Sequence, residues 1–124
     1  MEGYKVTIKE TSRELTARER IMMKDTTNAI KLDEVANEDH FVVTPVAYAI
    51  LSIHNEKSDN VDYNNYVIVD EAGNKYVTGS ESFWSAFIEI WDEMKDEAEP
   101  YQIAIYKMES KNYKGKMFIT CSII

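Results

Sequence analysis

Cysteine, glycine and proline are scarce in this sequence. The 124 residues include one cysteine, Cys121, together with four glycines and two prolines. A single cysteine cannot form an internal disulfide, which fits a reducing compartment, and we interpret it as a small buried hydrophobic side chain. No internal repeat, low-complexity tract or Gly/Ser linker is present, so we expect one compact unit.

The sequence also lacks a long apolar run. No segment approaches the roughly 18 consecutive apolar residues that a membrane span needs. The N-terminal stretch MEGYKVTIKE has no apolar core of the kind that a signal peptide contains. We therefore expect a cytoplasmic protein that does not enter a membrane.

Residues that carry catalytic or metal chemistry are few. The two histidines, His40 and His54, and Cys121 show no metal-ligand spacing. The P-loop, G-x-G-x-x-G, G-x-S-x-G and H-E-x-x-H patterns are absent. We expect neither an enzyme nor a metal or cofactor site.

Positive charge is scarce in the middle of the chain and present at both ends. Residues 1–31 hold seven Lys or Arg against five Asp or Glu, and residues 101–124 hold four against one. Residues 32–100 hold three against sixteen. Local charge, rather than the net charge of −8, decides where a phosphate chain can lie.

The first forty residues predict a short strand and a helix. Val6 and Ile8 alternate with lysines and indicate a strand over 4–10. Thr16 followed three residues later by Glu19 is a capping-box pattern that predicts a helix over about 17–25. Residues 26–35 are ambiguous and could form a strand. The basic residues Arg13, Arg18, Arg20 and Lys24 are interpreted as a solvated helix face rather than as a DNA contact.

From residue 41 the chain predicts strands around one helix. Residues 41–54 form a β-rich run in which Pro45 marks a start, an edge or a bulge. Strands at 66–70 and 75–79 form a hairpin, and Ser80 caps a helix over 81–99. The last strands, 101–108 and 116–124, flank a connection that includes Gly115.

The apolar spacing of the helix and of the last strand predicts which side chains are buried. Phe83 and Phe87 begin a buried helical stripe, and the same periodicity makes Trp91 a core residue and Trp84 a flank of that core, rather than a binding face. In the last strand the inward residues are Met117, Ile119, Cys121 and Ile123, and the outward residues are Lys116, Phe118, Thr120 and Ser122.

The order of these elements favours a known architecture. Three strands, a helix and two further strands follow the order of a five-stranded OB-fold barrel, with the helix between strands 3 and 4. We therefore expect a mainly β chain with α-helix, in which 41–124 is an OB-fold nucleic-acid-binding domain. Residues 1–40 form an N-terminal strand and helix extension packed on that barrel.

The C-terminal half also resembles a family. Gly73 and Tyr76 form a Gly-x-x-Tyr strand, a helix entered through serines follows, and the last hairpin carries Ser-Lys-x-x-x-Gly-Lys-x-Phe from Ser110 to Phe118. In these features residues 41–124 resemble the small OB-fold single-stranded DNA-binding proteins of bacteriophages of Gram-positive hosts. The resemblance implies single-stranded DNA binding in phage replication or recombination, with replication or recombination proteins as partners.

Single-stranded DNA binding needs cations along the phosphates and aromatic faces for unstacked bases. The candidates on the sheet are Tyr48, His54, Tyr66 and Tyr76. Those on the last hairpin are Tyr106, Lys107, Lys111, Tyr113, Lys114, Lys116 and Phe118.

Each candidate has a structural alternative. Tyr66 and Tyr76 could be half-buried β residues, since tyrosine favours strands. The hairpin lysines Lys111, Lys114 and Lys116 could be a solvated turn that only deters edge-to-edge aggregation. Phe118 could be a core residue if the phase of the last strand is shifted by one.

A rival function follows from the acidic middle. Such a domain could bind a basic protein surface, or imitate nucleic acid and inhibit another protein. Edge strands could in addition pair two chains into a homodimer.

Overall fold

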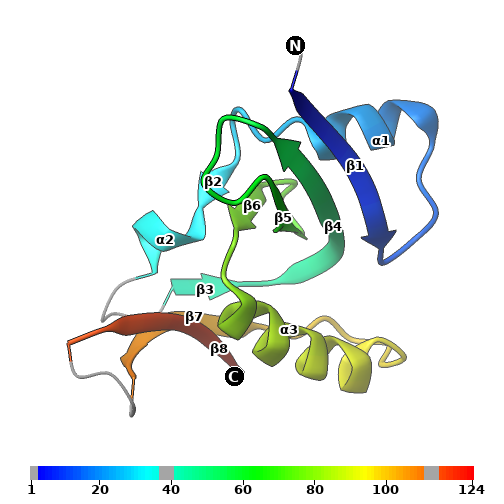
Figure 1. The fold of residues 1–124 in the computed structure, drawn as a ribbon. Helices are drawn as coiled ribbons and strands as arrows, with labels where there is room; N and C mark the ends of the chain where they lie inside the picture. Colours follow the sequence, from blue (N-terminus) through cyan, green and yellow to red (C-terminus); the bar gives the residue numbers. More distant parts are fainter. Residues whose placement is uncertain (1–2, 37–40, 111–114) are drawn as a thin grey trace.

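Within residues 3–36, 41–110 and 115–124, which the computed structural model describes, the strands form a five-stranded sheet, β1-β4-β5-β6-β2, and a three-stranded sheet, β3-β7-β8 (Figure 1). The helices are α1 (Ala17–Lys24), α2 (Leu32–Val35) and α3 (Glu81–Met94). The prediction of a mainly β chain is confirmed. The strands are β1 (Tyr4–Thr11), β2 (Ile30–Lys31), β3 (Phe41–Val43), β4 (Pro45–Asn55), β5 (Asp62–Asp70), β6 (Lys75–Thr78), β7 (Ile103–Glu109) and β8 (Met117–Ile123).

One long extended segment belongs to both sheets. Its first part, β3, pairs with β7, and its second part, β4, pairs with β1 and β5. Thr44 separates the two parts, and the register of β4 against β5 shifts between Pro45 and Ala47. Proline has no N–H for a ladder hydrogen bond, so this is where a strand is expected to break or bulge. The predicted irregularity at Pro45 is confirmed.

The five-stranded sheet is covered on both faces. On one face Tyr48 and Ile68 pack in a cluster with Phe87 of α3. On the other face Ala49 and Val67 belong to a second cluster, in which α1 and the segment before it also take part. Successive side chains of a strand point to opposite faces, so the alternating residues of β4 contribute side chains to both clusters.

Helix α3 begins and packs as its sequence predicts. The Ser80 hydroxyl accepts a hydrogen bond from the Phe83 N–H at 3.2 Å, which satisfies one free donor of the first turn. Phe83 and Phe87 are fully buried, while Trp84 and Trp91 are half-buried against the same cluster. The prediction that both tryptophans pack at this core is confirmed.

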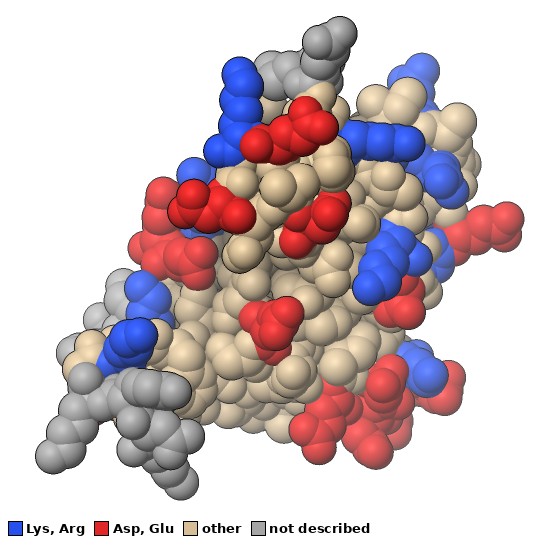
Figure 2. All heavy atoms as spheres, in the orientation of Figure 1, with Lys and Arg blue, Asp and Glu red and all other residues tan. Residues whose placement is uncertain are grey.

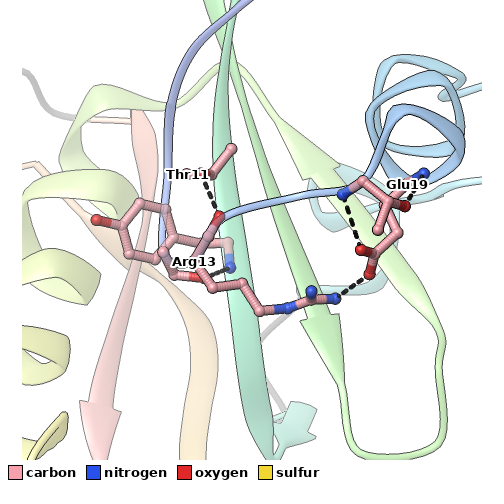
Figure 3. A network of polar contacts seen from close by, with 6 residues as sticks. Thr11, Arg13 and Glu19 are labelled. Atoms are coloured by element: carbon pink, nitrogen blue, oxygen red, sulfur yellow. Dashed lines mark hydrogen bonds and ion pairs between the residues drawn. The ribbon is translucent and has the colours of Figure 1, made fainter.

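A polar network fixes the passage from β1 to α1 (Figure 3). The Glu19 N–H donates to the Thr16 hydroxyl at 3.2 Å, and the Thr16 N–H donates to the Glu19 carboxylate at 3.0 Å, which completes the predicted capping box. Arg13 Nη2 lies 2.7 Å from Glu19 Oε2. The hydrogen bond from Arg13 lowers the pKa of Glu19 to about 2. Arg13 therefore serves the local fold.

Asp70 organises the turn between β5 and β6. Its carboxylate is buried and accepts hydrogen bonds from the Tyr76 hydroxyl at 2.7 Å, the Asn74 N–H at 2.8 Å and the Ala72 N–H at 3.0 Å. Burial by itself raises the pKa of Asp70, but the hydrogen bonds from Tyr76, Asn74 and Ala72 outweigh it and hold the pKa below its ordinary value. Gly73 supplies the positive φ of 88° in this turn.

We expect Asp70→Asn to destabilise the fold at neutral pH by about 1–3 kcal/mol, because the buried donors lose a charged acceptor. A lowered folded-state pKa contributes stability above the unfolded pKa, about 3.9 for aspartate, that is lost as pH falls through the folded value. The difference in free energy of unfolding between wild type and variant, measured by urea unfolding, should therefore shrink as the pH falls from 7 to 3. An equal difference in free energy of unfolding at pH 7 and pH 3 would contradict the claim that the ionised Asp70 carboxylate stabilises the turn.

The two sheets do not close into a barrel within the part of the chain that the structure describes. The edge of β6 that lies away from β5 pairs in parallel with β2, through Ile30 against Tyr76 and Lys31 against Val77. A strand has only two edges, so β8 has no place beside β6 and pairs with β7 alone. The predicted closed five-stranded barrel is therefore not formed. The ambiguous residues 26–35 supply β2 and α2.

The last strand has the predicted phase in its centre but not at its ends. Ile119 and Cys121 are buried, as predicted. Met117 and Ile123, also expected inside, are 50% and 47% exposed because they lie at the two ends of β8, past the core. Burial raises the pKa of the Cys121 thiol to about 12, so it stays protonated at neutral pH. The interpretation of Cys121 as a small buried side chain is confirmed.

Candidate nucleic-acid interface

The structure places the first predicted stacking residue, Tyr48, in the core. Its side chain lies on the α3 face of β4, where its ring centroid is 5.1 Å from that of Trp84 and 5.2 Å from that of Trp91. The residue is 7% exposed, and its hydroxyl donates a hydrogen bond to Glu10 at 3.1 Å. Burial, followed by the contact with Glu10, raises the pKa of Tyr48 to about 12.

Tyr66 and Tyr76 are core residues as well. The Tyr66 ring stacks on Trp84 with the centroids 4.7 Å apart and the planes 8° from parallel. Tyr76 lies edge-on to Phe41 and donates its hydroxyl to Asp70. The two tyrosines are 6% and 5% exposed. We therefore correct the expectation that they, like Tyr48, present open faces for bases: α3 and its neighbours occupy those faces.

His54 lies at the surface, but its surroundings do not suit a phosphate. Its Nδ1 atom is 2.7 Å from Asp62 Oδ1, and its Nε2 atom is 3.7 Å from Glu56 Oε1. The hydrogen bond with Asp62 is the main cause that raises the pKa of His54. Two carboxylates next to the ring disfavour a phosphate here, although Lys5 lies opposite His54 on β1, so the DNA contact at His54 stays a prediction.

The last hairpin places two predicted aromatic residues on the same face of its sheet. Tyr106 pairs with Thr120 across β7 and β8, and Met108 pairs with Phe118. Tyr106 and Phe118 are therefore diagonal neighbours on one face of the sheet, with Phe118 on one side of Thr120 and the Tyr106 hydroxyl directed to Ser122 on the other side. Both are half-buried. We call the outward face that carries these two rings the hairpin face.

The polar contacts of the hairpin separate its two sides. The Tyr106 and Ser122 hydroxyls are 2.6 Å apart on the hairpin face. Lys107 extends to the other side of β7, where its Nζ donates to the Asp33 carbonyl at 2.9 Å. That bond ties β7 to α2, so Lys107 is placed by the fold rather than beside the two rings.

Lys116 completes the described part of the hairpin face. It comes directly before β8, two residues from Phe118, and is exposed. The alternation of an extended chain places residues two apart on the same side. The other predicted residues of the hairpin, Lys111, Tyr113 and Lys114, lie outside the described residues.

Two apolar residues of the hairpin face were not among the sequence candidates. Met108 is 44% exposed and lies two residues beyond Tyr106, while Val42 is 46% exposed and pairs with Ala104 on β7. The period of two along β7 could have identified Met108. Val42 required knowledge of the β3–β7 pairing, which the sequence does not contain.

The charge of the surface is divided by region. Figure 2 shows Lys and Arg side chains around β1 and α1 and, separately, near the end of the β7–β8 hairpin at the lower left. Asp and Glu side chains lie between these regions and cluster near the end of α3. On the face that Figure 2 draws, the Lys and Arg side chains near the hairpin end therefore lie away from the acidic cluster at the end of α3.

Comparison of the chain with protein-family models, curated proteins and solved structures finds no match. Among residues 3–36, 41–110 and 115–124, no three His, Cys, Asp or Glu side chains are grouped so that they could hold a metal ion. No helix in this part of the chain is long and apolar enough to cross a bilayer.

Proposed function

We propose that the chain binds single-stranded DNA, without reading its sequence, on the hairpin face. The observation that carries this proposal is the diagonal pair of Tyr106 and Phe118, half-exposed on one face with Lys116 at its end. A stacking platform beside lysines is the combination that holds unstacked bases and their phosphates. The segment from residue 101 onwards, with four lysines and one glutamate, supplies the local positive charge.

An OB-type connectivity supports the same function. The β3–β4 segment contributes to both sheets, β5 and β6 form a hairpin, α3 follows, and β7 and β8 form a second hairpin. The order of these elements along the chain is like that of an OB fold, whose second and third strands and loops commonly bind oligonucleotides. We infer an OB-type fold that is open where β2 takes the edge of β6.

The N-terminal segment explains why we place the site on the hairpin face and not on β5 and β6, which correspond to strands 2 and 3 of an OB fold. Met23 of α1 and Leu15 pack in the cluster with Val67 of β5 and Val77 of β6. The sheet surface that OB folds commonly use is therefore covered by the chain's own residues. The resemblance to phage proteins adds the setting, which is DNA replication or recombination, with proteins of those processes as partners.

The proposal is tested by removing the lysines of the last hairpin. Replacing Lys111, Lys114 and Lys116 together with alanine should weaken oligo-dT binding, and the loss of three phosphate contacts should reduce the slope of log K against log salt by about 2. Lys111 and Lys114 enter this variant on the strength of the sequence alone. The measurement is fluorescence anisotropy of labelled oligo-dT over a series of salt concentrations.

A matched control carries the same change in charge at another place. Lys5, Lys9 and Lys24 lie on or beside β1 and α1, and their triple alanine variant should retain the wild-type slope. If both triple variants lose affinity equally, binding reflects overall charge and not the hairpin face. If neither does, the hairpin is not the site.

A further inference from the structure

A groove of about 460 Å³ runs between α3 and the end of β8. Its apolar lining includes Ile90 and Met94 of the helix and Cys121 and Ile123 of the strand. Apolar surface continues out of the groove, because Ile123 is 47% exposed and Ile124, the next residue, is 69% exposed. Contiguous exposed apolar surface of this kind marks interaction sites.

The backbone of Ile123 is available next to this groove. The Ser110 N–H donates to the Lys116 carbonyl, and the Ile124 N–H donates to the Gln102 carbonyl. Backbone groups alternate between the two edges of an antiparallel strand, so the even-numbered residues of β8 bond toward β7 and Ile123 points its N–H and C=O away from it. Within the described residues β8 is the last strand of its sheet. An incoming extended chain can therefore form main-chain hydrogen bonds here.

The rim of the groove is negative. Glu89 and Glu93 line it one helical turn apart, and neither forms an ion pair with any residue that the structure describes.

This charge decides between two kinds of occupant. A second copy of the chain, docked around a twofold axis, would bring the same patch against itself. The Glu89 and Glu93 carboxylates of both copies would then be brought together, which is unfavourable. A cationic segment gains from the same carboxylates.

We propose that the groove between α3 and β8 binds an extended segment of a partner protein, with apolar side chains in the groove, a main-chain contact at Ile123, and Lys or Arg residues beside Glu89 and Glu93. Addition of an extended chain at a sheet edge is a common mode of peptide recognition. The site uses the edge of β8, whereas the hairpin face uses the outward side chains of β7 and β8. The inference does not depend on DNA binding.

The test uses two synthetic peptides and the full chain. Both peptides alternate leucine and threonine over six residues; one is flanked by two lysines at each end and the other by two glutamates. Fluorescence anisotropy should detect binding of the lysine-flanked peptide alone, with amide chemical-shift changes at Ile123 and Ile124. Glu89→Lys with Glu93→Lys should weaken binding by about tenfold or more, since rim charges are reversed.

A control variant has the same change in net charge. Glu97→Lys with Glu99→Lys alters exposed residues outside the groove and should leave peptide affinity within about twofold of wild type, as expected for rim-distant charges. If both variants lose peptide affinity equally, overall charge explains the loss and the proposal is overturned. Absence of peptide binding would overturn the proposal as well. A dimer in sedimentation analysis that protects the Ile123 amide from exchange would overturn it in favour of a second copy of the chain.

Discussion

Replacing both Tyr106 and Phe118 with alanine is expected to weaken oligo-dT binding by at least about 30-fold, since each stacked base contributes about 1–3 kcal/mol. The two rings lie diagonally on the hairpin face, and both are half-exposed. Their removal leaves the buried side of β7 and β8 intact, so the urea midpoint should change little. Fluorescence anisotropy with labelled oligo-dT measures the loss, and the single variants divide it between the two rings.

The control is another exposed tyrosine. Tyr4 is 42% exposed on β1, which belongs to the other sheet. Tyr4→Ala should therefore bind oligo-dT as the wild type does. Unchanged affinity in the double hairpin variant, with the fold intact, would contradict the placement of the site.

Tyr66→Ala is expected to have the opposite profile, with a large loss of stability and no direct loss of binding. The ring is 6% exposed and stacks on Trp84 with centroids 4.7 Å apart. Truncating a buried aromatic side chain leaves a cavity and costs about 3–5 kcal/mol of unfolding free energy. Urea unfolding measures this loss, and affinity is measured under conditions in which the variant is folded.

The conservative variant separates the ring from its hydroxyl. Tyr66→Phe keeps the stack on Trp84 and should lie within about 1 kcal/mol of wild type. A Tyr66→Ala variant of normal stability that has lost oligo-dT binding would contradict the burial and return Tyr66 to the interface.

Local signals in the sequence were sufficient for much of the secondary structure. Thr16 with Glu19 and Ser80 with its following turn specify helix starts through hydrogen bonds that involve only neighbouring residues. Pro45 marks a break because its ring removes a donor wherever it occurs. Such features depend on a few adjacent residues, and they were predicted correctly.

The faces of the five-stranded sheet could not be assigned in the same way. The alternation in β4 correctly separates Tyr48 from Ala49, but it does not reveal what covers each side. Covering Tyr48 required α3, and covering Ala49 required α1 and its preceding segment. Both contacts are remote in sequence, and this is why three tyrosines were assigned to a binding surface.

The failure to predict that the two sheets stay unclosed within the described residues has a similar origin. The pairing of Ile30 with Tyr76 joins a short segment to a strand more than forty residues away. Neither propensity nor spacing indicates that two residues will take the edge of β6. The β7–β8 hairpin, in contrast, depends on contacts between consecutive strands, and the pairing of its two strands was predicted correctly.

The central claim is that this chain binds single-stranded DNA, and a titration of fluorescein-labelled oligo-dT tests it most directly. The titration is run beside duplex DNA of the same length at two salt concentrations. We predict tight binding to the single strand, weaker binding to the duplex, and a loss of affinity at the higher salt concentration because phosphate contacts release counterions. No binding to oligo-dT at low salt would contradict the account.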